Sequence, residues 1–179
     1  MEFICKALKL NCDPTRRGYW IEGYYVKHLT FTPSPILPND ENARKEIEKE
    51  IDEATKHYIF CDEFSDWNMS RGIEKHEIDV RTLHYFTGIR VYEKDFKKYP
   101  VRLWQGDIVE VGEEKERGVV VWCTNLCSFI IVRESSVEWD GIYPILTVTE
   151  PTEVITIVSD VTDMTIVGNV FDKMKGKND

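Results

Sequence analysis

Short stretches of alternating apolar and polar residues recur along the chain, and a period of two residues is typical of β-strands. The clearest early stretch is YWIEGYYVKHLTF (residues 19–31), where aromatic and β-branched residues alternate in part. Gly23 interrupts it, which indicates a bulge or the close approach of another backbone. A weaker strand covers residues 3–10, and CDPTRRG (residues 12–18) supplies a turn between the two. We therefore predict a hairpin at the start of the chain.

One segment has a helical period instead. The apolar residues that share one helix face are Ala43, Ile47, Ile51 and Ala54. Asn39 or Asp40 can cap the N-terminus of this segment, and acidic residues occupy its first turn. We predict a surface helix over about residues 40–57, within an insert at about residues 39–57. Because the apolar stripe is narrow, the helix is expected to lie on a sheet or to line an oligomer contact.

The second half of the chain returns to strand patterns. Strands that begin at Asp107, Gly118 and Cys127 are predicted to form a meander. GVVVWC (residues 118–123) and CSFIIVRES (residues 127–135) are nearly continuous apolar runs, which predicts strands covered on both faces. Gly106 lets the chain turn before the first of these strands, and Asp107 can accept backbone N–H bonds there.

Taken together, the patterns predict a mainly β (β-rich α+β) fold, in which several short strands form a curled sheet of SH3-like or barrel type beside one surface helix. A chain of 179 residues with 42% hydrophobic and 12% aromatic residues can bury one core of ordinary size. We expect a single domain over residues 1–172 and a disordered tail over residues 173–179.

Charge narrows the classes of partner. Thirty-two acidic and 23 basic residues give a formal net charge of −9, which repels phosphate backbones. Nucleic-acid binding is therefore disfavoured. The sequence offers no stretch of about 20 apolar residues and no secretion signal, so we expect no membrane contact and a cytoplasmic location. Five cysteines, an odd number without a secretion signal, are expected to be reduced.

Several motifs follow one another in a recognisable order. They are RRGYWIEGYYV (16–26), HYIF (57–60), DVRTLHYFTGIRV (79–91), LWQGDIVEV (103–111), GVVVW (118–122) and TIVGNVF (165–171). In content and order they resemble the YopX-type proteins of phages and prophages, over about residues 1–172. Gln105 stands where that family has an acid before the glycine. The resemblance implies a β-rich, self-associating cytoplasmic protein of a phage or prophage, without catalytic residues, in the bacterial host.

Side chains that could carry chemistry are few. Cys123 and Cys127 could hold part of a zinc site with Cys61, Cys12 or a histidine, but the two lie about 13 Å apart on a continuous strand, so no metal site is predicted. A cysteine paired with His28, His57, His76 or His84 would make a nucleophile, yet no local signature supports a pair. His57 and His84 lie beside aromatic residues and are better explained as core or boundary histidines.

Acidic residues cluster in two places, and both clusters are interpreted as solvated loop acids. They are Asp62, Glu63 and Asp66, and Asp160 with Asp163. Their spacing does not match a calcium loop. No cofactor is predicted.

Aromatic residues are the most plentiful remaining feature, and most are expected to fill a core or an interface. If a ligand site exists, it should include Tyr24, Trp104 and Trp122, with Arg102 supplying a positive charge.

Two functional hypotheses follow from these features. The first is a phage- or prophage-encoded accessory protein of unknown biochemical activity. It would act as a self-associating interaction module whose acidic surface meets a basic host or phage protein. The alternative is a sequestering protein that binds a small molecule or nucleotide in an aromatic pocket. An enzyme that uses Cys and His ranks last.

Overall fold

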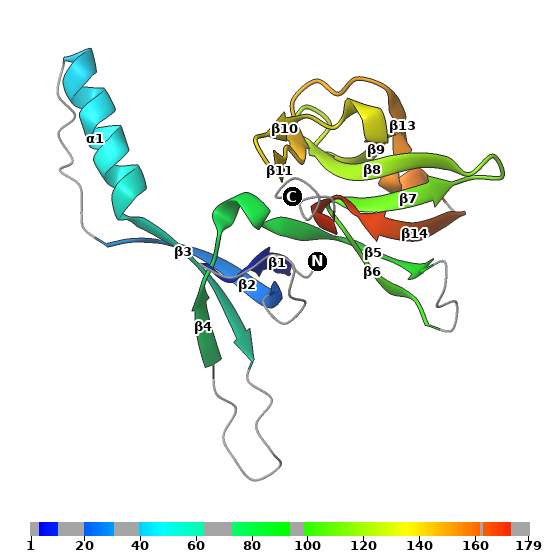
Figure 1. Cartoon of the computed structure of the whole chain (residues 1–179), viewed down its shortest axis with the longest axis horizontal. Helices are drawn as coiled ribbons and strands as arrows, with labels where there is room; N and C mark the ends of the chain where they lie inside the picture. Colours follow the sequence, from blue (N-terminus) through cyan, green and yellow to red (C-terminus); the bar gives the residue numbers. More distant parts are fainter. Residues whose placement is uncertain are drawn as a thin grey trace, which may run out of the picture.

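The computed structural model describes residues 4–10, 20–30, 40–62, 73–93, 99–161 and 163–172. This part of the chain is mainly β, as the sequence predicts, and contains one α-helix (Figure 1). The predicted turn at residues 12–18 and the predicted tail at residues 173–179 lie outside the described residues. The single-domain assignment stays a prediction.

The elements follow one another along the chain with short connections. The strands are β1 (Cys5–Leu8), β2 (Trp20–Leu29), β3 (Thr55–Asp62), β4 (Ile73–Glu77), β5 (His84–Glu93), β6 (Val101–Trp104), β7 (Asp107–Val111), β8 (Glu116–Cys123), β9 (Ser128–Arg133), β10 (Trp139–Asp140), β11 (Tyr143–Pro144), β12 (Thr147–Val148), β13 (Val154–Ile157) and β14 (Met164–Asn169). The helices are α1 (Glu41–Ala54) and the short 3₁₀ turns η2 (Val80–Thr82), η3 (Glu134–Ser136) and η4 (Val158–Asp160).

Twelve strands form one mixed sheet in the order β13-β9-β8-β7-β14-β5-β1-β2-β3-β4, with β12 paired to β8 and β6 to β5. The pairs β14 with β5 and β12 with β8 are parallel, and the other pairs of this sheet are antiparallel. The predicted β1–β2 hairpin and β7–β8–β9 meander are both confirmed. Within the described residues the strand order does not return to its first member, so the sheet is open rather than a closed barrel.

Strands β7, β8 and β9 are covered on both faces, as their apolar runs predict. Val119 and Val121 belong to one buried cluster, and Val120 belongs to another on the opposite face. Ile130 and Ile131 of β9 alternate in the same way. Each of these five side chains is at most 1% exposed. The β8–β9 pair is therefore the centre of the fold, with a hydrophobic layer on either side.

A third buried cluster anchors the N-terminal strands. It contains Cys5 and Ala7 of β1, Ile59 of β3 and Ile78. Gly23 of β2 lies against β3, and a Cβ there would collide with the carbonyl oxygen of Phe60. The close backbone approach predicted at this glycine is confirmed.

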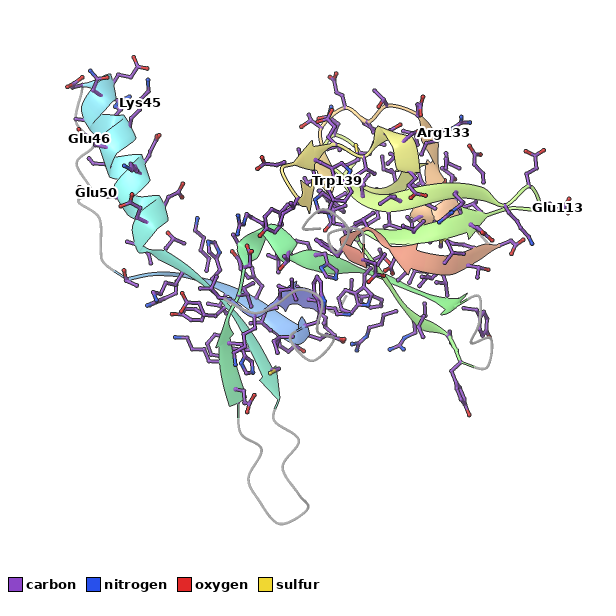
Figure 2. All side chains as sticks on the ribbon, viewed as in Figure 1. Lys45, Glu46, Glu50, Glu113, Arg133 and Trp139 are labelled. Atoms are coloured by element: carbon purple, nitrogen blue, oxygen red, sulfur yellow. The ribbon has the colours of Figure 1, made fainter. Side chains whose placement is uncertain are left out.

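Helix α1 projects away from the sheet (Figure 1). The Asp40 side chain accepts a hydrogen bond from the Asn42 N–H at 3.1 Å, which fixes its first turn. The helix ends at Ala54 because Thr55 already belongs to β3, so it is three residues shorter than predicted. None of its residues is buried, and the expected packing across a sheet is wrong. Charged side chains stand out around it (Figure 2).

The turn before β7 has the structural role that its sequence predicts. Gly106 has a φ of 89°, a conformation that glycine adopts without strain. The Asp107 carboxylate accepts the Trp104 N–H at 2.7 Å and an N–H of the Asn169 side chain at 2.8 Å. Asp107 thus joins the β6–β7 turn to β14. In place of the family acid, Gln105 is buried and donates to the Leu146 carbonyl at 2.6 Å.

Among the described residues, no helix is long and apolar enough to cross a membrane.

Candidate functional site

Two of the four predicted ligand residues lie close together. Arg102 and Trp104 are both on β6, beside Phe86 of β5. The Trp104 ring lies 5.7 Å from the Phe86 ring, and the Arg102 guanidinium lies 5.5 Å from the same ring. Arg102 also forms an ion pair with Glu22 of β2. Its positive charge is therefore already engaged by a carboxylate on the neighbouring part of the sheet.

The other two candidates lie elsewhere. Tyr24 is on β2, where its side chain is 58% exposed. Trp122 is on β8, and its ring packs edge-on against Phe129 at 4.9 Å. Within the described part of the chain, neither ring contacts Trp104. The ligand-binding role of these four residues stays a prediction.

Trp104 belongs to an aromatic cluster that brings distant parts of the sequence together. His84 lies at its centre, with ring distances of 5.3 Å to Trp20, 5.7 Å to Trp104 and 5.1 Å to Phe171. The Lys6 ammonium lies 5.6 Å from the Trp20 ring and 5.9 Å from the Trp104 ring. Desolvation lowers the pKa of Lys6, and the charges of Asp107 and Asp172 partly oppose this.

His84 is a structural residue, in agreement with the sequence interpretation. It is fully buried, and one ring nitrogen lies 2.8 Å from the Thr82 carbonyl oxygen, to which it can donate. Burial lowers the pKa of its imidazole to about 3, and the nearby Lys6 acts in the same direction. The neutral ring therefore serves as a polar member of an aromatic core.

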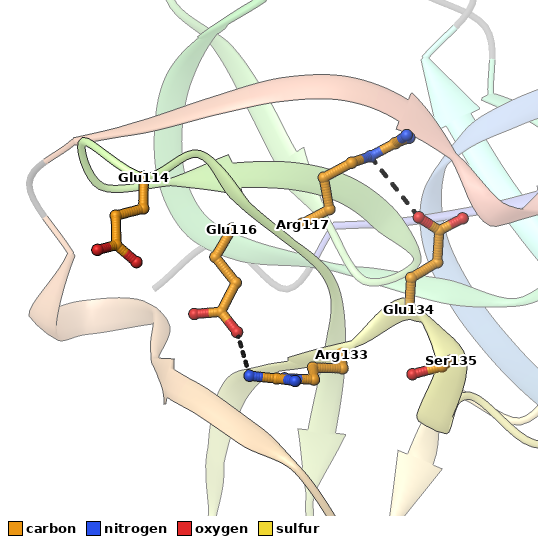
Figure 3. Close-up of a pocket in the computed structure, with 6 residues that line it drawn as sticks. All are labelled: Glu114, Glu116, Arg117, Arg133, Glu134 and Ser135. Atoms are coloured by element: carbon orange, nitrogen blue, oxygen red, sulfur yellow. Dashed lines mark ion pairs between the residues drawn. The ribbon is translucent and has the colours of Figure 1, made fainter.

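A charged depression of about 480 Å³ lies beside the β7–β8 turn (Figure 3). Its lining residues are Glu114, Glu116, Arg117, Arg133, Glu134 and Ser135. Both arginines pair with carboxylates, Arg117 with Glu134 at 3.7 Å and Arg133 with Glu116 at 2.9 Å. The depression contains none of the four predicted ligand residues. Its compensated charges and polar lining suit water better than an aromatic ligand.

The zinc alternative at Cys123 and Cys127 finds no support in the geometry. Cys123 is buried, and its thiol donates to the Thr149 carbonyl at 3.6 Å. Cys127 is exposed in the β8–β9 turn, where its thiol donates to the Thr124 carbonyl at 3.4 Å. Cys12 lies outside the described residues.

A different group of metal-ligating side chains occurs on the β3–β4 hairpin. The sulfur of Cys61, a carboxylate oxygen of Glu74 and a ring nitrogen of His76 all lie within 4.8 Å of one another. Sequence reasoning missed this group, because Cys61 is separated from the other two by a segment whose length does not fix the register of the strands. The alternation of His76 with Glu74 was the available signal, since two residues apart on a strand share a face.

The same hairpin, together with β2, has exposed apolar side chains on its surface. Tyr24 and Val26 of β2 are 58% and 41% exposed, and Ile73 of β4 is 73% exposed. The ammonium of Lys75 lies 3.7 Å from the centre of the Tyr58 ring on this surface. Of the predicted loop acids, Asp160 accepts a bond from Ser159 at 3.0 Å. The side chains of Asp62, Glu63 and Asp66 lie outside the described residues.

Comparison with protein-family models, with curated proteins and with solved structures gave no match for this chain.

Proposed function

We propose that the protein is a non-catalytic interaction module that self-associates, an accessory protein of the YopX type encoded by a phage or prophage. The observation that carries this proposal is the projecting helix α1, which has an apolar stripe but no buried residue. An amphipathic helix gains most of its stability by burying its apolar face. A helix that is exposed on all sides in one copy of the chain is therefore best explained by a contact with another molecule.

The exposure of α1 follows its stripe. Ala43, Ile47, Ile51 and Ala54 are partly shielded, and the other ten positions of the helix are exposed. On the outer face, Lys45 pairs with Glu41 at 3.4 Å and Lys49 pairs with Glu53 at 3.7 Å, each one turn apart. The charged side is thus complete within one molecule, and the apolar side is the face available for contact.

The charge along α1 favours a second copy of this chain in antiparallel orientation. Residues 41–47 contain two acids and two bases, whereas residues 48–54 contain four acids and one base. A parallel pair would place two acidic halves together, and an antiparallel pair opposes each acidic half with a neutral one. Two helices of 14 residues bury far less than a standard interface of about 1,600 Å², so we expect weak, concentration-dependent dimers.

Sedimentation velocity over a range of protein concentrations tests the proposal. The double variant Ile47→Glu with Ile51→Glu places two charges on the stripe and should remain monomeric where the wild type dimerises. The control variant Lys45→Gln with Lys49→Gln makes the same change in net charge on the outer face and should still dimerise. The proposal is wrong if the wild type stays monomeric at the highest concentration, or if both variants associate like the wild type.

An acidic surface supports the second part of the proposal, a basic host or phage protein as a further partner. The net charge of −9 would speed the encounter of the two and would make their association sensitive to salt. The alternative function, sequestration of a small molecule or nucleotide, has weaker support, because Arg102 is paired with Glu22 and the described depression lies away from Trp104.

A further inference from the structure

The β3–β4 hairpin places three different metal-ligating side chains on one face of the sheet. Cys61 of β3 lies directly opposite Glu74 of β4, and His76 follows two residues later on the same strand. Because side chains alternate between faces with a period of two, all three point to the same side. Lys75, between the two β4 residues, points to the other side, where its ammonium lies against the Tyr58 ring.

The ligand atoms are already near the spacing that one metal ion requires. The Nε2 atom of His76 lies 2.7 Å from a carboxylate oxygen of Glu74, and the sulfur of Cys61 lies within 4.8 Å of both. Zinc bonds of about 2.0–2.3 Å in tetrahedral geometry separate two ligand atoms by about 3.3–3.6 Å. Side-chain rotations that move each atom by about 1 Å reach this spacing, without a change in the strands.

We infer that Cys61, Glu74 and His76 form a binding site for a borderline-soft divalent metal ion of the zinc class. The chemistry of the three donors selects this class, because thiolate and imidazole suit Zn²⁺ and Co²⁺, whereas Mg²⁺ and Ca²⁺ require oxygen ligands alone. Three protein ligands leave a fourth position for water or for a ligand from another molecule. This inference is independent of the self-association proposed above.

The surroundings suit a surface site that exchanges metal with solvent. The side chains of His76 and Glu74 are 16% and 45% exposed, and Cys61 is half-buried. Without a metal, the imidazole and the carboxylate of this pair hydrogen-bond to each other. A bound ion would replace that bond with two coordinate bonds and would add a link from β4 to β3. Since β4 is the last strand of the sheet, the ion would fasten an edge strand to its neighbour.

Titration of the metal-free full chain with Co²⁺ tests the site. A cobalt–thiolate bond produces a charge-transfer band in the near ultraviolet, and the intensity of the visible bands reports tetrahedral geometry. We expect one Co²⁺ per chain with both signals, and competition by Zn²⁺ but not by Mg²⁺. The inference is wrong if Co²⁺ does not saturate at one per chain, or if the charge-transfer band is absent.

Variants assign the site to its residues. Cys61→Ser should abolish the charge-transfer band, and Cys127→Ser, which removes an exposed thiol in another turn, should leave it unchanged. Glu74→Gln and His76→Gln should each weaken Co²⁺ binding about tenfold or more. Because both lie on an exposed edge strand, they should fold even if Cys61→Ser does not, which circular dichroism checks. A band that persists in Cys61→Ser, or wild-type affinity in both β4 variants, would overturn the assignment.

A measurement on the wild type separates a site on the hairpin from one elsewhere. Zn²⁺ should slow amide hydrogen exchange in Ile73–Glu77 (β4) and leave the β8–β9 strands unaffected. Protection confined to another part of the chain would place the metal elsewhere.

Discussion

Neutralising the titration of His84 should remove a defined part of the acid sensitivity of this protein. Burial among Trp20, Trp104 and Phe171 lowers the pKa of His84 from an ordinary value of 6.5 to about 3. The unfolded chain therefore binds a proton at this residue at a higher pH than the folded chain does. The contribution to stability is complete above the unfolded-state pKa and is lost as the pH falls from there toward the folded-state pKa.

The size of the loss at pH 5 follows from the unfolded state, because the folded imidazole is still neutral at that pH. With an unfolded pKa of 6.5, protonation of the unfolded chain lowers the free energy of unfolding by about 2 kcal/mol between pH 7.5 and pH 5.0. With a urea m-value of about 2 kcal/mol/M, the unfolding midpoint shifts by about 1 M. His84→Asn retains a side-chain N–H that can donate to the Thr82 carbonyl, but it does not titrate.

Urea unfolding of both proteins at the two pH values measures the effect. The free energy of unfolding of the wild type should fall by about 2 kcal/mol more than that of His84→Asn. Other histidines and carboxylates are present in both proteins, so their contributions cancel in this difference. The exposed His28 provides a control, and His28→Asn should lose as much stability as the wild type. An equal loss in the wild type and His84→Asn would refute the assignment of a buried, neutral His84.

Two further changes test how the sheet is held together. Gly118→Ala should lower the free energy of unfolding by about 3 kcal/mol or more, because the added Cβ would lie 2.7 Å from the Val132 carbonyl oxygen, whereas Gly168→Ala, whose Cβ would meet its nearest neighbour at 3.8 Å, should change it by less than about 1 kcal/mol. Asp107→Ala should cost about 2–3 kcal/mol, because it leaves the buried Trp104 N–H without its acceptor, and Glu113→Ala in the exposed β7–β8 turn should cost almost nothing. Urea unfolding at pH 7.5 measures all four, and a tolerated Gly118→Ala or Asp107→Ala would contradict the packing described for that residue.

Sequence reasoning was most successful where the structure depends on local patterns. The helix α1 was predicted within a few residues, because an N-cap at Asp40 and a periodic stripe are properties of one segment. The apolar run at residues 118–123 predicted a strand covered on both faces, which Val119, Val120 and Val121 confirm. The structural role of Asp107 followed from its place after a glycine at a strand start.

Predictions that depended on the meeting of distant segments were less successful. An SH3-like closure was expected, but the strands form an open sheet in which β14 lies beside β5 and β7. The aromatic candidates were selected by type, and the structure pairs Trp104 with His84 while it places Trp122 against Phe129. No pattern within either segment distinguishes these neighbours, since a strand residue reveals its face but not its partner.

The sequence by itself determined the mainly β character of this protein, the position of its helix and the residues of its most buried strands, because alternation and capping act over a few residues. Only the tertiary structure decided that α1 projects from the sheet and that Cys61 faces Glu74 and His76. Strand order and register arise from contacts between segments far apart in the chain, and a shift of one residue in register would move all three metal-ligating side chains apart.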